Sequence, residues 1–397
     1  MSLIPFSEIF ALAEKHFERL LAFRRHLHAH PELSYQEYKT SAFIQDALSK
    51  EGIGFTSGIA ETGILAEVSG SDEGKTVALR GDMDALPIQE ENQCEYKSVH
   101  TSVMHACGHD VHSTCVYGAA LILQELQDRF KGKVQFVFQP AEEKLPGGAK
   151  LMLESGLFAK QKPDALFALH VFPSLPAGKL GFKAGMYMAS ADELYFTVKG
   201  KGGHAAMPHQ VSDPIVAAAH LITALQSVSS RLAPPGIPTV LSIGKVIANG
   251  ATNVIPDKVQ LDGTFRTMDE TWREAAHTHI RTIAKNCAEM FGLSIEVRIE
   301  KGYPVLINDA HVTEKAQSIA ANAIGEENVV SLEMRMTSED FAWFAQEMPA
   351  CFFRLGTAGE NGKFTSGLHT STFDIDERAI LTGTASMVAI ALGFLED

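Results

Sequence analysis

The chain has 397 residues, more than a single hydrophobic core usually supports, so we expect two domains. Its content of 45% hydrophobic and 21% charged residues is ordinary for a globular protein. The formal charge of −14 argues against nucleic acid or an anionic membrane as a partner, because both attract a basic surface.

Cysteine use and hydropathy favour a cytoplasmic protein. The five cysteines are odd in number and widely spread, which argues against a disulfide framework and fits a reducing compartment. Residues 1–10 lack a basic region and a long apolar core, so we expect no signal peptide. No run of about 18 apolar residues occurs, so we expect no membrane span.

Helices and strands alternate in the first part of the chain. Apolar periodicity predicts helices at 7–30, 35–50 and 109–129. Apolar runs predict buried strands at 63–69, 75–80, 133–138 and 164–169. This alternation predicts a largely parallel sheet with helices on both faces.

The pattern changes near Gly185. From there the elements are predicted as strand, helix, strand, strand, helix and strand, at 192–199, 213–230, 238–247, 257–267, 271–291 and 293–300. This order is the ferredoxin-like split motif, a small sheet with two helices on one face. The first pattern then resumes, with elements at 310–324, 338–347, 350–355 and 376–394. We therefore predict an α/β protein in which an α+β domain, 185–301, is inserted into a larger domain made of 1–184 and 302–397.

Residues that bind metals gather in one motif and after three of the predicted strands. The motif is His105-Ala106-Cys107-Gly108-His109-Asp110, and the later residues are Glu142, Glu143, His170 and His369. We expect each strand to end just before its polar residue, at the sheet edge where α/β proteins bind ligands. Five donors, one of them a thiolate, indicate a two-metal hydrolytic site. Thiolate, imidazole and carboxylate together suit zinc, manganese, iron or nickel.

Each of these residues alone also fits a structural role. A single histidine is most often a core or surface residue, and Cys107 could pack as a small apolar side chain. Glu142 and Glu143 point in different directions, so one could bind metal while the other acts as a general base, but an arbitrary pair of glutamates is most often solvated. Asp82 and Asp84 could orient a ligand imidazole from behind, or form a turn. The joint placement of the donors favours the metal site.

Ten ordered motifs, spread nearly from end to end, resemble one known family. They lie at 24–37, 80–88, 105–112, 139–143, 169–173, 200–209, 253–257, 263–267, 338–344 and 368–377. The chain is similar to the aminoacylase and glutamate-carboxypeptidase family of dinuclear metallohydrolases. Within it, the chain resembles the amidohydrolase subfamily of hippurate hydrolases and auxin–amino-acid conjugate hydrolases. The resemblance implies a zinc-peptidase-like catalytic domain with a mixed central sheet, and an inserted ferredoxin-like domain that serves as lid and dimerisation surface.

The resemblance also implies a metal-ligand set. Cys107 would bridge two divalent metal ions, His109 and Glu143 would complete one site, and His170 and His369 would complete the other. Manganese or zinc would be the metal, with nickel, cobalt or iron as alternatives.

Three further assignments follow from the resemblance. Glu142 would be the general base and acid. In much of the wider family a metal-binding His occupies the position of Asp82 and an Asp bridges the metals, and here Cys107 and His109 replace those donors. Ser371 occupies a position where the subfamily often has Pro, which bears on the shape of the acyl pocket.

The inserted domain carries three candidate substrate residues. By resemblance, His204 would polarise the scissile carbonyl and stabilise the oxyanion. Asn253 and Arg266 could hold the substrate carboxylate, although Arg266 also fits a surface salt bridge. The family often dimerises through this domain, so a partner chain could supply the working His204.

We therefore expect an enzyme that hydrolyses the amide bond of N-acyl amino acids, hippurate-like or N-acetylated, to a carboxylic acid and a free amino acid. The first alternative is a metallo-carboxypeptidase or dipeptidase with the same dinuclear site. A hydrolase with Cys107 as nucleophile would leave Glu142, Glu143, His170 and His369 unexplained. A catalytically silent metal-binding protein would lack a member of the set, and none is missing.

Overall fold

The computed structural model describes residues 4–396, which fold as two compact units. The larger unit comprises the residues up to Tyr187, Ile307–Glu333 and those from Asp340 onward. The smaller unit comprises Met188–Leu306 and Met334–Glu339. The stretch Met334–Glu339 thus belongs by its contacts to the smaller unit, whereas the division expected from the sequence places all of 302–397 in the larger domain.

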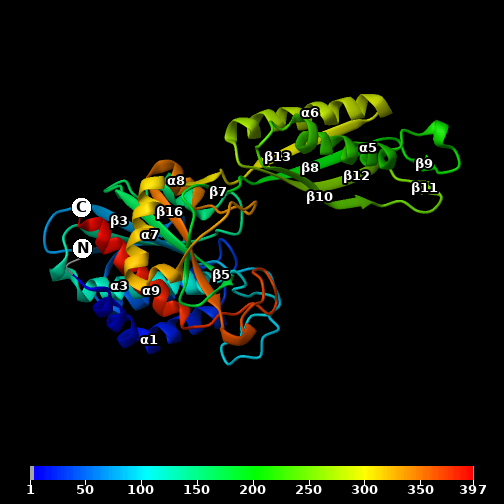
Figure 1. The fold of residues 1–397 in the computed structure, drawn as a ribbon. Helices are drawn as coiled ribbons and strands as arrows, with labels where there is room; N and C mark the ends of the chain where they lie inside the picture. The colour runs from blue at the N-terminus through cyan, green and yellow to red at the C-terminus, as the bar shows by residue number, and fades with distance from the viewer. Residues whose placement is uncertain (1–3, 397) are drawn as a thin grey trace. The chain divides into compact units, whose positions relative to one another are not determined.

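A mixed eight-stranded sheet lies at the centre of the larger unit (Figure 1). Its order is β1 (Gly54–Ile59), β2 (Gly63–Ser69), β4 (Lys133–Gln139), β3 (Thr76–Asp82), β5 (Ala165–Pro176), β16 (Ala350–Ala358), β6 (Leu180–Phe182) and β15 (Val329–Ser331). The central strands β4, β3, β5 and β16 are parallel. Antiparallel pairs flank them, β1 with β2, β2 with β4, and β16 with β6. The mixed α/β sheet is therefore confirmed, and its parallel pairs lie at the centre and, between β15 and β6, at one edge.

The central strands are buried on both faces because helices cover them. Every residue of β3 is buried, as is typical of a parallel strand between helices. The helices α3 (His109–Glu125), α7 (Ala310–Ile324) and α9 (Ala379–Leu395) pack on the strands of the sheet, and α1 (Phe6–Ala29) packs on α3 and α9. Three shorter helices contact the sheet elsewhere, namely α2 (Tyr38–Lys50), α4 (Gly148–Glu154) and α8 (Ala342–Glu347).

The strand register brings the ends of the central strands level with one another. Asp82 at the end of β3 is opposite Gln139 at the end of β4, and the pair Arg80–Ala168 places His170 level with Asp82. β5 continues past His170 because it remains paired with β16. The expectation that this strand ends at His170 is therefore wrong, although His170 does lie level with the carboxyl ends of β3 and β4.

The smaller unit contains a four-stranded antiparallel sheet in the order β10, β12, β8, β13. Its elements follow the chain as β8 (Asp192–Lys199), α5 (Pro214–Ser227), β10 (Thr239–Ala248), β12 (Lys258–Thr267), α6 (Glu270–Phe291) and β13 (Ser294–Lys301). This is the β-α-β-β-α-β order expected from the sequence. A short ribbon of β9 (Gly203–His204) and β11 (Val254–Ile255) extends from it (Figure 1).

The helix Pro214–Leu232, which is α5 with the π turn after it, covers this sheet. Among the described residues it is the one helix long and apolar enough, by length and composition alone, to cross a membrane. Its buried residues Ala217, Leu221 and Leu225 belong to the apolar core that the helix forms with the sheet. Its apolar composition is therefore explained in part by packing on β8, β10 and β12.

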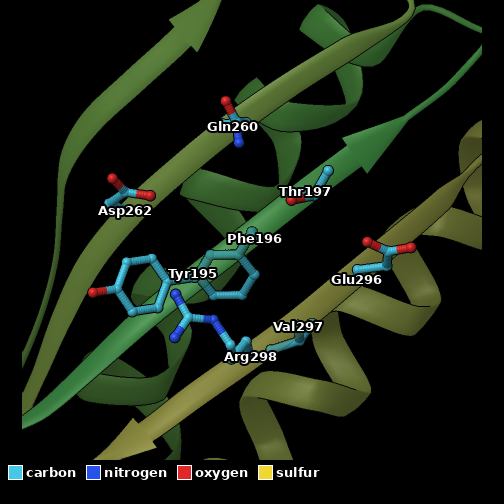
Figure 2. A pocket seen from close by; sticks show the side chains of 8 residues that line it. All are labelled: Tyr195, Phe196, Thr197, Gln260, Asp262, Glu296, Val297 and Arg298. Atoms are coloured by element: carbon cyan, nitrogen blue, oxygen red, sulfur yellow. The ribbon is translucent and has the colours of Figure 1, made fainter.

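The opposite face of the same sheet is open and polar. Figure 2 shows a shallow hollow there, lined by side chains of β12, β8 and β13. The guanidinium of Arg298 lies over the ring of Tyr195, 3.8 Å from its centroid, and Lys199 pairs with Glu296. These side chains are engaged with one another, and the residues that line the hollow include none of the proposed site residues.

Candidate metal centre

Six polar side chains of the larger unit converge near the carboxyl ends of β3 and β4, level with His170 inside β5. Their ligand atoms form three groups, each with all atoms within 4.8 Å: Cys107–His109–His170, Cys107–Glu143–His369 and His109–Glu142–Glu143. The structure thus brings together all five proposed donors and the proposed base, from segments far apart in the chain.

His170 presents one ring nitrogen to the thiol of Cys107. Its Nδ1 donates to the carbonyl of Val171 at 2.8 Å, which leaves Nε2 with a free lone pair 3.4 Å from Cys107 Sγ. A neutral imidazole fixed in this tautomer is the form that binds a metal.

His112 has both ring nitrogens engaged and so lies behind the donors, one turn along α3 from His109. Its Nε2 accepts the N–H of Val171 at 2.9 Å, and its Nδ1 donates to Asp82 Oδ1 at 2.6 Å. The second oxygen of Asp82 accepts from Arg80 at 2.6 Å. Burial alone would raise the pKa of Asp82, but Arg80, His109 and His112 hold it well below its usual value. Asp82 therefore supplies fixed negative charge next to the donors.

Asp84 orients two of the proposed donors at once. Its Oδ1 accepts from His109 Nδ1 at 3.1 Å. Its Oδ2 accepts from the backbone N–H of Glu143 at 3.0 Å and from Ser34 Oγ at 2.6 Å. His109 Nε2 is thereby turned inward, where it is buried without a hydrogen bond. This is the carboxylate–histidine arrangement that supports metal ligands.

The first turn of α3, which begins at His109, is fastened to α1. Asp110 Oδ2 accepts from Arg24 Nε and from His28 Nδ1, each at 2.8 Å, and all three side chains are buried. The backbone that carries His109 is therefore held from both sides, by this cluster and by Asp84.

Glu142 and Glu143 face different partners, as expected for adjacent residues after a strand. Glu142 Oε1 accepts the backbone N–H of Asp340 at 3.4 Å. Glu143 Oε1 lies 3.1 Å from His369 Nε2 and 3.9 Å from His109 Nε2, yet it is buried without a hydrogen bond. Glu143 is thus the carboxylate that points between two imidazoles.

His369 comes from a loop rather than from the end of a strand. β16 ends at Ala358, and His369 follows in a turn with φ of 61°, where its backbone N–H donates to the carbonyl of Ala106 at 2.8 Å. This bond fixes His369 beside the segment that carries Cys107.

The donor set fits divalent metal ions. Burial raises the pKa of the Cys107 thiol well above its usual value, and Glu143, Glu142 and Asp82 raise it further. A thiolate among these carboxylates needs a cation as counter-charge. His109 Nε2 and Glu143 Oε1 are buried without a hydrogen bond, as ligand atoms would be before metal binds. Sulfur, nitrogen and oxygen donors together suit a transition metal.

The candidate residues of the smaller unit are not all brought together. His204 and Asn253 are neighbours in the β9–β11 ribbon, where the N–H of Ala205 donates to the carbonyl of Asn253 at 3.0 Å. Arg266 lies near the opposite end of β12, roughly 25 Å away along an extended strand. There it donates to the hydroxyls of Ser338 and Thr264, and burial lowers its pKa.

Sequence reasoning gave no role to the network that holds the loop after β4. Arg80 donates to Gln139 at 2.8 Å and to Asp340 at 2.9 Å, and Gln139 donates to Asp340 at 2.7 Å. The backbone N–H of Asp340 is the group that contacts Glu142. An arginine inside an apolar strand was the available signal, since a buried guanidinium requires carboxylate partners.

Comparison with known proteins agrees with this geometry. Residues 78–393 match the model of peptidase family M20/M25/M40. An N-acyl-L-amino acid amidohydrolase of Geobacillus stearothermophilus is 42% identical over 76% of this chain and 81% of its own. Thermostable carboxypeptidase 2 of Saccharolobus solfataricus is 36% identical over 94% and 95% of the two chains.

A solved structure extends the likeness to three dimensions. A dinuclear metal-binding peptidase of family M20 from Bacillus subtilis superposes with a TM-score of 0.82 at 35% identity, over 96% of this chain and 99% of that one. The resemblance drawn from the sequence motifs is confirmed. The chain belongs to peptidase family M20/M25/M40, a family of hydrolases.

Proposed function

We propose that the protein is a metal-dependent amidohydrolase that cleaves the amide of N-acyl amino acids to a carboxylic acid and a free amino acid. The observation that carries the proposal is the convergence of four donors on the thiol of Cys107, with a sixth residue, Glu142, beside them. The relative from Geobacillus stearothermophilus supports the substrate class. The buried free thiols of Cys115, Cys287 and Cys351 support a cytoplasmic location.

We assign two divalent metal ions to the centre, manganese or zinc. Cys107 is grouped with His109 and His170 and also with Glu143 and His369, so its sulfur lies near donors of both proposed sites, which supports a bridging role. His109 and Glu143 would complete one site, and His170 and His369 the other. When bound, the ions would polarise the scissile carbonyl and lower the pKa of an attacking water.

Glu142 moves the proton. It is almost fully buried next to Glu143, and it would accept the proton of the attacking water and then deliver it to the leaving nitrogen. The C–O bond would form first and give a tetrahedral oxyanion. The C–N bond would then break as the leaving nitrogen takes the proton that Glu142 had accepted from the water. Asp84 holds His109 and the backbone of Glu143, and Asp82 holds His112 behind the donors.

A substrate panel tests the proposal. Metal-replete protein is assayed against N-acetyl amino acids, N-benzoyl amino acids and dipeptides, and both products are identified. We expect turnover of the N-acyl amino acids. Turnover of dipeptides alone would favour the carboxypeptidase or dipeptidase alternative. The similarity to thermostable carboxypeptidase 2 of Saccharolobus solfataricus is the reason to test it.

We further propose that the protein forms a homodimer through the smaller unit. β10 is an edge strand of the four-stranded sheet and exposes Val246 and Ile247, whereas the opposite edge strand β13 carries alternating charges. Charged residues protect edge strands from pairing, so β10 is the unprotected edge. Ile215 and Val216 of α5 add exposed apolar surface in the same unit. A second copy of the chain, related by a two-fold axis, would cover the β10 edge and the exposed apolar residues of α5.

In such a dimer, His204 of the partner subunit would support the oxyanion. The substrate carboxylate would be bound by Arg266 of the chain that holds the metal ions and by Asn253 of the partner subunit. His204 and Arg266 lie far apart along the same sheet, so the smaller unit of one chain cannot bring both residues to the same metal centre. This separation supports the assignment of the two residues to different chains.

Mixed dimers test the sharing of His204 between chains. His204→Ala should lower turnover severely and leave metal content unchanged, and Glu142→Gln should be inactive. After subunit exchange, mixtures of the two should regain activity, because one of the two centres then combines an intact Glu142 with an intact His204. No recovery, with exchange verified by mass spectrometry, would place His204 in its own chain's centre.

A further inference from the structure

The loop Glu32–Glu37, between α1 and α2, lies against the segment that follows β3. The sequence predicts a helix from residue 35, but α2 begins only at Tyr38. Leu33 forms a parallel bridge with Ala85, and the N–H of Ala85 donates to the carbonyl of Glu32 at 2.8 Å. The loop is therefore held next to Asp84, to which Ser34 donates.

The hydroxyl of Tyr35 spans the turn that follows Glu142 and Glu143. It donates to the carbonyl of Lys144 at 2.8 Å and accepts the N–H of Gly147 at 3.2 Å. These two bonds link both ends of the turn to the loop Glu32–Glu37.

Glu37 fixes the backbone immediately before Glu142. Its side chain is fully buried, and Oε1 accepts the N–H of Ala141 at 2.8 Å and the N–H of Tyr35 at 3.0 Å. Ala141 and Tyr35 have φ of 50° and 68°, in the left-handed region that non-glycine residues rarely occupy. Such residues keep this conformation only where their surroundings impose it.

We infer that Glu37 and Tyr35 are positioning residues for the hydrolytic reaction, because they fix the direction in which Glu142 leaves the end of β4. The inference rests on the function proposed above. Glu37 acts as a hydrogen-bond acceptor for two backbone N–H groups and does not require its charge. Burial raises the pKa of Glu37 to about 7, with Asp84 adding to the effect, so the carboxyl is only partly ionised near neutral pH.

Comparison of Glu37→Leu with Glu37→Gln shows whether the Glu37 side chain acts as a hydrogen-bond acceptor or through its charge. Leucine removes the acceptor of the Ala141 and Tyr35 N–H groups and of the Thr62 hydroxyl, whereas glutamine keeps an amide oxygen for the two N–H groups. We expect kcat of Glu37→Leu to fall about 10–100-fold with KM and metal content near wild type, since small misplacement of a catalytic group is costly. Glu37→Gln should retain most of kcat. Glu32→Leu is the matched control, because the Glu32 side chain accepts the N–H of Thr40 at the start of α2.

Tyr35→Phe gives a second test should Glu37→Leu fail to fold. It removes one hydroxyl, and we expect kcat to fall several-fold with an unchanged Tm. Tyr38→Phe is its control, since the Tyr38 hydroxyl donates to Glu61 at the surface at 2.9 Å. Wild-type kcat in both Tyr35→Phe and Glu37→Leu would overturn the inference, and so would a loss explained wholly by lost metal.

The double variant Glu37→Leu/Glu142→Gln reports whether Glu37 acts through Glu142. If it does, Glu37→Leu should have little further effect on the residual rate of Glu142→Gln, because residues that act as a unit are not additive. An unchanged 10–100-fold loss in that background would overturn the inference. Wild-type turnover of Glu142→Gln alone would instead refute the proposed function.

Discussion

Glu142→Gln protein is expected to bind its full complement of metal and to lose turnover by about 10²–10⁴-fold, the contribution typical of a general acid–base group. The amide matches the carboxylate in shape and can still accept the N–H of Asp340, so the loop should not move. It cannot take a proton from water. Metal content by elemental analysis and kcat under saturating substrate are the two measurements.

Glu143→Gln is the matched control, since it makes the same change one residue later. Glu143 Oε1 lies between His369 and His109, so this variant should lose metal affinity and recover part of its activity at high metal concentration. If Glu142→Gln lost metal and Glu143→Gln kept it, the roles assigned to the two residues would have to be exchanged.

Cys107→Ala is expected to lose both metal ions and essentially all activity, because Cys107 belongs to two of the donor groups. Cys115→Ala makes the same change at a thiol of α3 that is buried in the apolar core, and it should keep metal and turnover. Metal per chain, activity and Tm are measured for both.

Chelation of the wild-type enzyme, rather than this pair of variants, distinguishes the metal mechanism from a cysteine hydrolase. A Cys107 nucleophile would also be lost in Cys107→Ala, but the wild-type enzyme would then work without metal. Full activity after exhaustive chelation would therefore reject the metal mechanism, whereas loss on chelation and return on adding manganese or zinc would support it.

The long elements could be predicted because their periodicity and burial coincide. The strand 63–69 was placed at the residues of β2, and the insertion was ordered correctly, since alternation and amphipathic helices show in a single sequence. β6 and β15 escaped prediction, because strands as short as Leu180–Phe182 carry too few residues to show a period. The end of β5 was misplaced because its pairing partner, β16, lies far away in sequence.

The candidate centre was predictable as a set of residue types and not as a set of contacts. Cys107, His109, Glu143, His170 and His369 could be chosen by chemistry and resemblance, and the structure gathers them. The hydrogen bond from the N–H of Ala141 to Glu37 could not be predicted. It depends on the loop Glu32–Glu37, whose sequence resembles the start of a helix, and on the left-handed conformation of Tyr35 and Ala141. Backbone conformation of this kind is set by tertiary contacts, which local sequence does not encode.

The donors enter the centre from positions that span most of the chain, from Cys107 to His369, with the whole smaller unit encoded between His170 and His369. During synthesis, the segment with His369 is made after all of the insertion. A nascent chain can therefore offer an incomplete set of ligands, but the full centre exists only once translation is nearly finished. Under the proposed ligand assignment, metal acquisition would be completed only at the end of synthesis, and a chain truncated before residue 369 would lack one donor.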